Sequence, residues 1–306
     1  MNIYLAPLEG ITDNIYRNTF YRLYGGVTRM YTPFLSPNST EKFPAREWDN
    51  IDPAINDSDI IVPQLLTCNS QHFLWAAKEI CGLGFKEINL NLGCPSGTVV
   101  AKKKGSGLLY YPWELDIFLQ EIFEGAYKLG QNISIKTRIG KNSCEEWPEI
   151  LDIFKKYPVS ELIIHPRLTC DFYKGPLHME CFDAAYSQCK YPVVYNGDIK
   201  SLADIDKISA SYTDCSALMI GRGLIENPAM LSDASTTLKE FHDELVIQYQ
   251  KRLSGEMPLL HRMKEMWGFW QNNIPDSPDK DKLLKKLFKT KNYAEYSSLA
   301  NALFSL

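Results

Sequence analysis

The chain alternates eight times between a short strand-like run and a segment with helical spacing. The strand-like runs cover residues 2–7, 28–34, 59–66, 87–93, 133–140, 161–167, 192–198 and 217–223. Each run ends at glycine, proline or polar residues. Eight alternations of this kind are typical of a parallel sheet closed into a (β/α)8 TIM barrel. An open, doubly wound sheet is the alternative, but no Gly-x-Gly-x-x-Gly motif follows an early strand.

The last part of the chain has a different pattern. Residues 238–254 and 259–271 show helical spacing, and the second of these segments carries a stripe of methionine and tryptophan. A lysine-rich segment follows in residues 282–289. We therefore predict a barrel domain in residues 1–235 and a small all-α helical domain in residues 236–306.

Composition and charge limit the class of protein. The 306 residues are 45% hydrophobic and 23% charged, which suits a folded chain with a large core. The apolar runs are far shorter than a membrane span, and the N-terminus opens on a strand-like run without a leader pattern. We expect a cytoplasmic monomer that makes no membrane contact.

The eight cysteines do not form a metal motif along the sequence. Cys181 and Cys189 are the closest pair, and the histidine spacing around them does not match a ligand pattern. We expect reduced thiols and no metal ion.

Charge is distributed unevenly along the chain. The net charge of −4 argues against a nucleic-acid partner, but residues 236–306 carry 11 Lys or Arg against 9 Asp or Glu. A basic surface on the helical domain therefore remains compatible with the composition, as does a purely solvated helix face.

Polar and glycine residues collect where the predicted strands end. In a TIM barrel these ends share one rim, where the chemistry is located. The residues at these positions are Pro7, Leu8, Glu9, Gln64, Asn91, Cys94, Lys136, Arg138, His165, Arg167, Asn196, Gly197, Asp198, Gly221 and Arg222. Singly, each has a plain structural explanation, such as a buried histidine or a turn. Jointly they predict a binding site.

Two glycine-bearing loops follow the last two predicted strands. Barrels commonly hold a phosphate group at this place, with backbone N–H groups and a helix N-terminus as donors. Arg222 would add a positive charge. We therefore expect a cofactor that carries a phosphate.

Cys94 stands at the end of the fourth predicted strand. Alternating apolar and polar residues precede it, and the run stops at Gly93-Cys94-Pro95. Pro95 restricts the backbone of Cys94, so the thiol is held at a stiff exit from the strand. A loop with three lysines, residues 102–104, follows. A buried, inert thiol is the alternative interpretation, but this setting favours a chemical role.

These motifs resemble those of the tRNA-dihydrouridine synthases. The resemblance covers residues 6–228 and includes an Ala-Pro-x-x-Gly-x-Thr-Asp opening. The other matching motifs are Asn91-x-Gly93-Cys94-Pro95 with Gly105-x-Gly107, Lys136-x-Arg138-x-Gly140, His165 with Arg167, Asn196-Gly197-Asp198, and residues 219–223. Pro166 and Leu168 stand where the family often has glycine and threonine.

The resemblance implies FMN on the barrel rim, NADPH as the reductant, and a uridine of the tRNA D-loop as the substrate. Cys94 would be the general acid that protonates C5 of the uracil ring. A thiol with a pKa near 8.5 is protonated at neutral pH and suits this role. The C-terminal helices would bind tRNA.

The resemblance also implies roles for the other rim residues. The expected FMN contacts are Pro7, Leu8, Glu9, Gln64, Lys136, His165, Asn196, Gly197, Asp198, Gly221 and Arg222. The expected substrate contacts are Asn91, Arg138 and Arg167.

Two other functions remain open at this level. One is a barrel flavoprotein that acts on a free pyrimidine, similar to dihydroorotate dehydrogenase, although a small substrate does not require a helical appendage. The other is a tRNA-binding protein without catalytic activity, which the presence of Cys94 disfavours.

Overall fold

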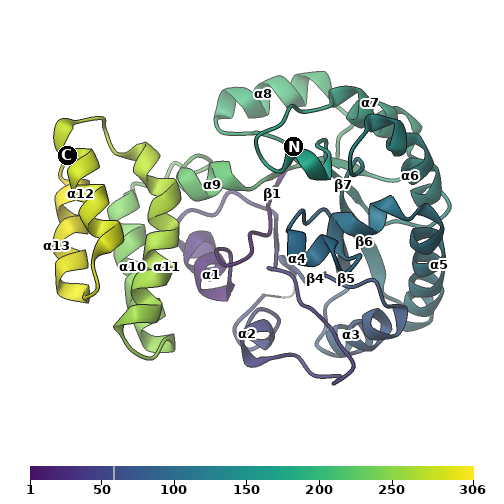
Figure 1. Cartoon of the computed structure of the whole chain (residues 1–306), viewed down its shortest axis with the longest axis horizontal. Helices are drawn as coiled ribbons and strands as arrows, with labels where there is room; N and C mark the ends of the chain where they lie inside the picture. Colours follow the sequence, from purple (N-terminus) through teal and green to yellow (C-terminus); the bar gives the residue numbers. More distant parts are fainter. Residues whose placement is uncertain (58) are drawn as a thin grey trace.

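The computed structural model describes residues 1–57 and 59–306, and its centre is a parallel sheet closed into a barrel (Figure 1). The strands are β1 Asn2–Leu5, β2 Arg29–Tyr31, β3 Ile61–Val62, β4 Gln64–Leu65, β5 Glu87–Leu92, β6 Asn132–Arg138, β7 Leu162–His165, β8 Val193–Tyr195 and β9 Ala217–Ile220. Their order is β3-β2-β1-β9-β8-β7-β6-β5-β4. Because β3 and β4 are consecutive in the chain, the two ends of this order meet. The predicted barrel is confirmed.

The third predicted strand, residues 59–66, is divided into β3 and β4 by Pro63. Proline has no N–H for a strand ladder. Before it, Val62 O accepts from Thr32 N at 3.1 Å. After it, Gln64 N donates to the Thr32 hydroxyl at 3.0 Å rather than to a backbone oxygen. β3 therefore pairs with β2, while β4 pairs with β5.

Helices surround the barrel (Figure 1). They are α1 Asn14–Leu23, α2 Ala45–Trp48, α3 Ser70–Gly82, α4 Gly97–Val100, α5 Pro112–Leu129, α6 Trp147–Phe154, α7 Met179–Gln188, α8 Leu202–Ser211 and α9 Arg222–Glu226, with 3-10 turns η1 Gly105–Tyr110, η2 Cys144–Glu146 and η3 Thr169–Asp171. Helix α5 illustrates how the sequence sets the ends and the buried face of a helix. It begins at Pro112, ends before Gly130 at a φ of 66°, and buries the apolar stripe that includes Leu115, Phe118 and Ile122. Burial of each such side chain contributes about 1.5–3 kcal/mol to the stability of the folded state.

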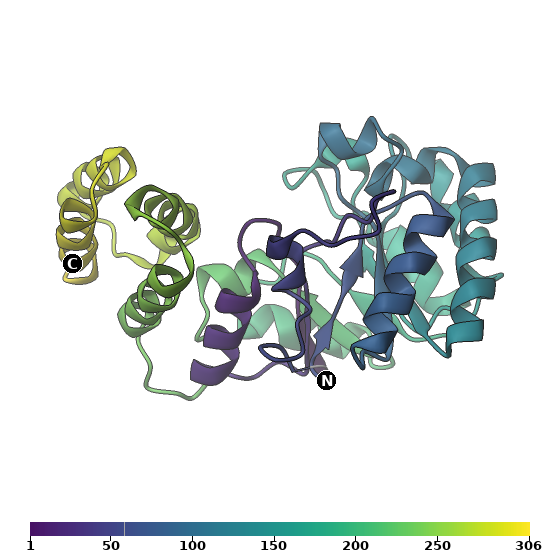
Figure 2. The same cartoon turned by 90° about the horizontal axis from the view of Figure 1, so that it is seen from below.

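The C-terminal part is entirely helical and lies beside α1 and α9 (Figures 1 and 2). Its elements are α10 Leu238–Arg252, α11 Glu256–Trp270, η4 Gln271–Asn273, α12 Pro278–Lys289 and α13 Tyr293–Phe304. Thr237 and Glu240 form a capping box at the start of α10. Trp267 and Trp270 are fully buried, so the aromatic stripe of the sequence is core.

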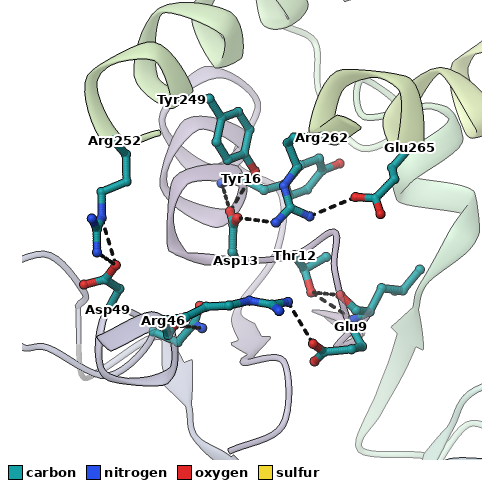
Figure 3. A network of polar contacts seen from close by, with 12 residues as sticks. Glu9, Thr12, Asp13, Tyr16, Arg46, Asp49, Tyr249, Arg252, Arg262 and Glu265 are labelled. Carbon is teal, nitrogen blue, oxygen red and sulfur yellow. Dashed lines mark hydrogen bonds and ion pairs between the residues drawn. The ribbon is translucent and has the colours of Figure 1, made fainter. Parts of the chain in front are cut away.

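Polar contacts join this helical part to the first βα loop of the barrel (Figure 3). The Asp13 carboxylate caps α1 by accepting from Tyr16 N at 3.0 Å. It also accepts from the Tyr249 hydroxyl of α10 at 2.8 Å and lies 3.5 Å from Arg262 of α11. Arg252 pairs with Asp49. The helical part is therefore tied to the segment that directly follows Pro7, Leu8 and Glu9.

In the part of the chain that the structure describes, no helix combines the length and the apolar character needed to cross a membrane.

Candidate active site

A cavity of about 720 Å³ opens where the barrel strands end. All the predicted site residues except Arg167 line it. They are Pro7, Leu8, Glu9, Gln64, Asn91, Cys94, Lys136, Arg138, His165, Asn196, Gly197, Asp198, Gly221 and Arg222. The volume falls in the range of cofactor sites, which is roughly 300–1,000 Å³.

Asn91 holds the backbone on which Cys94 stands. Its Oδ1 accepts from the N–H groups of Gly93 at 3.0 Å and Cys94 at 2.9 Å. Its Nδ2 donates to Gln64 Oε1 at 2.7 Å. Asn91 therefore positions Cys94 and also lines the cavity, and its predicted contact with a substrate stays a prediction.

The loop after Cys94 folds back onto it. Ser106 donates to the Cys94 carbonyl from its N–H at 3.2 Å and from its hydroxyl at 2.9 Å. Gly105 adopts a φ of 56°, and a Cβ atom there would lie 2.9 Å from the Cys94 carbonyl oxygen. A glycine is required by both the conformation and the contact.

The Cys94 thiol is half-buried on the cavity wall. Burial raises its pKa, although the N–H of Ser96 and the charge of Arg138 act in the opposite direction. The thiol therefore keeps its proton at neutral pH, which is the state required of a general acid.

Lys136 enters the same cavity from β6. Burial lowers the pKa of its ammonium group to about 7, with a further contribution from Arg138, and only Cys94 acts in the opposite direction. An anionic group that binds beside Lys136 favours the protonated form of the lysine, and the resulting positive charge stabilises the bound anion. Lys136 is thus suited to hold the negative edge of a ligand.

Arg138 lies at the edge of the cavity, but backbone carbonyls occupy its guanidinium. Its Nε donates to Gly93 O at 3.0 Å, its Nη1 to Leu168 O at 2.7 Å and its Nη2 to Phe172 O at 2.6 Å. The side chain therefore fastens the loop of Cys94 to the loop that follows β7. These three bonds leave two of the five N–H groups of the guanidinium, and Arg138 lines the cavity, so its predicted contact with substrate stays a prediction.

Arg167 lies behind the cavity wall and is 4% exposed. It donates to both carboxylate oxygens of Asp198, at 2.9 and 2.5 Å. Its Nη1 also lies 3.1 Å from Nε2 of His165. Through these contacts Arg167 supports Asp198 and His165, and its predicted contact with the substrate stays a prediction.

His165 is neutral in this setting. Burial lowers its pKa well below the usual value, and the neighbouring Lys136, Arg138 and Arg167 add to the shift. Because Arg167 donates toward Nε2, the ring accepts there and carries its hydrogen on Nδ1. The histidine can therefore donate one hydrogen bond without bringing a charge into the cavity.

The two glycine loops approach each other closely beside Asp198. A Cβ atom at Gly223 would lie 2.1 Å from Ile199 O, so the loops could not meet with any other residue there. Arg222 donates to Asp198 Oδ1 at 2.9 Å and keeps part of its guanidinium exposed. Together with Lys200, it gives this end of the cavity a positive charge.

Several wall residues were not predicted from the sequence, among them Phe34, Phe172, Tyr173 and Phe269. The Tyr173 ring lies between the guanidinium groups of Arg138 and Arg222, with its centroid 5.3 and 5.2 Å away. An irregular loop has no periodic signal that would have identified it. Phe269 comes from α11, and only the packing of the helical part brings it to the cavity.

The chain is similar to known proteins over most of its length. A family model described as "Dihydrouridine synthase (Dus)" matches residues 4–298. tRNA-dihydrouridine synthase B of Pasteurella multocida is 29% identical over 251 residues, which cover 80% of this chain and 72% of that one. tRNA-dihydrouridine(16) synthase of Pseudomonas putida is 30% identical over 234 residues, 74% of this chain and 71% of that one.

Solved structures support the fold. Morphinone reductase superposes with a TM-score of 0.55 at 10% sequence identity, covering 78% of this chain and 88% of that chain. A variant of NCR from Zymomonas mobilis superposes with a TM-score of 0.50 at 13% identity, covering 80% of this chain and 87% of that chain.

Proposed function

Since the chain belongs to the dihydrouridine synthase family, we propose that it reduces the C5–C6 double bond of a D-loop uridine in tRNA, with FMN as cofactor and NADPH as reductant. The observation that carries this proposal is the pairing of a protonated thiol, Cys94, with an ammonium group of lowered pKa, Lys136, in one cavity. We further propose that the enzyme acts as a cytoplasmic monomer.

The cavity fits FMN in size and charge. Lys136 suits the electron-rich edge of an isoalloxazine ring, and the Gln64 and Asn91 amides lie on the same wall. Arg222 and Lys200, beside the two glycine loops, suit the phosphate. When bound, FMN supplies the hydride that reduces the uracil ring.

The chain's own residues supply the proton and the geometry. Cys94 holds a proton on Sγ and delivers it to C5 as general acid. Asn91, Ser106 and Arg138 fix the loop from which the thiol acts. Lys136 would stabilise negative charge on a ring bound beside it in the cavity.

Helix α12 offers a surface for the phosphates of tRNA. Lys285, Lys286 and Lys289 surround a shallow hollow together with Thr290 and Glu295. These lysines lie on the helical part, which is anchored beside the cavity through Asp13. We propose that they contact the RNA backbone while a uridine enters the barrel.

The test is reconstitution with purified components. We expect a yellow protein that, with NADPH, adds two hydrogens to a uridine of unmodified tRNA, measured by mass spectrometry of the digested nucleosides. Free uracil and orotate serve as control substrates. Reduction of these small molecules in preference to tRNA would favour the free-pyrimidine alternative. A protein that binds tRNA but cannot take up FMN would refute the proposal.

A further inference from the structure

A second group of reactive side chains lies outside the cavity. Cys144, Glu180 and Cys181 bring two sulfur atoms and a carboxylate oxygen within 4.8 Å of one another. Cys144 belongs to η2, after β6, and Cys181 to the first turn of α7. Neither cysteine takes part in the proposed chemistry at Cys94.

The surrounding structure holds these residues in place. Ser143 and Glu146 form a capping box around η2. The Trp147 indole donates to Cys181 O at 2.7 Å, which joins the segment after η2 to the start of α7. Two elements that are distant in the sequence are thus locked together where the thiols meet.

His178 lies next to this group, on the side of Glu180. Its Nε2 lies 3.2 Å from Asp171 Oδ2, and its Nδ1 lies 3.5 Å from Glu180 Oε1. The Asp171 carboxylate is itself fixed, because Oδ2 accepts from Leu168 N at 2.8 Å. A histidine held by a carboxylate through one nitrogen presents the other nitrogen to a metal in many metal sites. Nδ1 of His178 lies beside the Glu180 carboxylate, outside the set of three ligand atoms that lie within 4.8 Å of one another.

We propose that Cys144, Cys181 and Glu180 bind a zinc-type divalent cation, and that the neighbouring His178 imidazole moves toward the sulfurs to complete the site, with Asp171 orienting its ring. Two sulfurs, one imidazole and one carboxylate are a donor set that suits Zn²⁺. Binding replaces the thiol protons with the cation, and the protons leave to solvent. Cys144 and Cys181 come together only through the fold, which is why the cysteine spacing indicated no metal.

The position of the site suggests a structural role. It joins the loop after β6 to the start of α7, and residues 169–178 lie between β7 and α7. That segment carries Phe172 and Tyr173, which line the cavity. A cation here would hold the segment in place, a function independent of the proposed reaction.

The experiment is metal analysis of the full-length protein, purified under reducing conditions without chelator. We expect about one equivalent of Zn²⁺ by elemental analysis. After its removal, we expect one equivalent of Cd²⁺ to bind, detected by ultraviolet thiolate-to-cadmium charge-transfer absorption. Cys144→Ser and His178→Gln should lose most of this binding. Asp171→Asn should weaken it by roughly 10–100-fold, as expected for a residue that orients a ligand.

Cys189→Ser is the matched control, because Cys189 lies at the other end of α7, outside the cluster. Circular dichroism would show whether each variant is folded. If the cysteine variants do not fold, His178→Gln tests the proposal. Absence of Zn²⁺ together with no Cd²⁺ signal would overturn the proposal. It would also be overturned if Cys189→Ser lost as much metal binding as Cys144→Ser. A Cys144–Cys181 disulfide whose reduced form binds no Cd²⁺ would overturn it as well.

Discussion

Cys94 and Lys136 face one cavity, and burial favours the neutral form of each. Burial raises the pKa of the thiol and lowers that of the ammonium group to about 7. The first residue then retains a proton to deliver, while the second gains a proton when an anion arrives.

Replacing Cys94 should separate the two halves of the reaction. In Cys94→Ala, reduction of bound flavin by NADPH should continue at the wild-type rate, because that step needs no protein acid. Reoxidation by tRNA should fall by roughly 10²–10⁴-fold. Single-turnover absorbance of the flavin measures both steps. Cys94→Ser should rescue little, and Cys189→Ala should behave as wild type. Unchanged reoxidation in Cys94→Ala would make Cys94 an inert thiol.

Lys136 should make FMN binding depend on pH. Above pH 7 the free protein holds Lys136 neutral, so binding an anionic flavin requires uptake of a proton. Affinity should therefore fall by up to about tenfold per pH unit above 7. Lys136→Met should bind FMN roughly 10–100-fold more weakly with a flatter pH profile. Calorimetry in buffers of different ionisation enthalpy measures the proton uptake. A pH-independent wild-type affinity would contradict this assignment, and the exposed Lys78→Met is the control.

Among the elements, α1 connects the first cofactor loop to the helical part. Asp13 caps α1, accepts from Tyr249 and faces Arg262, so the effect of its charge can be separated from that of its hydrogen bonds. Asp13→Asn keeps an effective cap but loses the charge that faces Arg262, whereas Asp13→Ala loses both. We expect Asp13→Ala to be less stable than Asp13→Asn by about 1 kcal/mol in urea unfolding. Equal stability of the two variants would show that capping by Asp13 contributes nothing.

At the scale of the whole molecule, the helical part is continuous with the barrel core. Phe241 packs edge-on against Tyr16, the Trp270 indole donates to Ile225 O, and Phe269 reaches the cavity. Removing residues 238–306 would expose this apolar face. We therefore expect truncation to impair flavin reduction as well as RNA binding, so point variants are the better test of RNA contact.

The lysines of α12 provide that test. Changing Lys285, Lys286 and Lys289 to glutamine should leave the fold and flavin reduction intact but weaken tRNA binding. The slope of log affinity against log salt should fall by roughly one unit for each phosphate that a lysine no longer neutralises. A matched control changes Lys78, Lys128 and Lys207, exposed lysines on α3, α5 and α8, to glutamine. If both triple variants bind tRNA equally well over a salt series, α12 does not contact the RNA.

Features that depend on neighbouring residues could be predicted from the sequence alone. Strand and helix periodicity predicted the barrel, and the glycine and proline around Cys94 placed its thiol at a strand end. Because parallel strands end on one rim, residues such as Lys136 and Arg222 could be assigned to a common site before the fold was known.

The partners that each polar group meets depend on the tertiary structure. Arg138 and Arg167 lie at predicted strand ends, and the fold brings three backbone carbonyls to Arg138 and the Asp198 carboxylate to Arg167. Phe269 enters the cavity from another part of the chain, and Cys144 meets Cys181 across two elements. These contacts join residues far apart in the sequence. They depend on side-chain direction and on helix packing, which the local periodicity of a sequence does not encode.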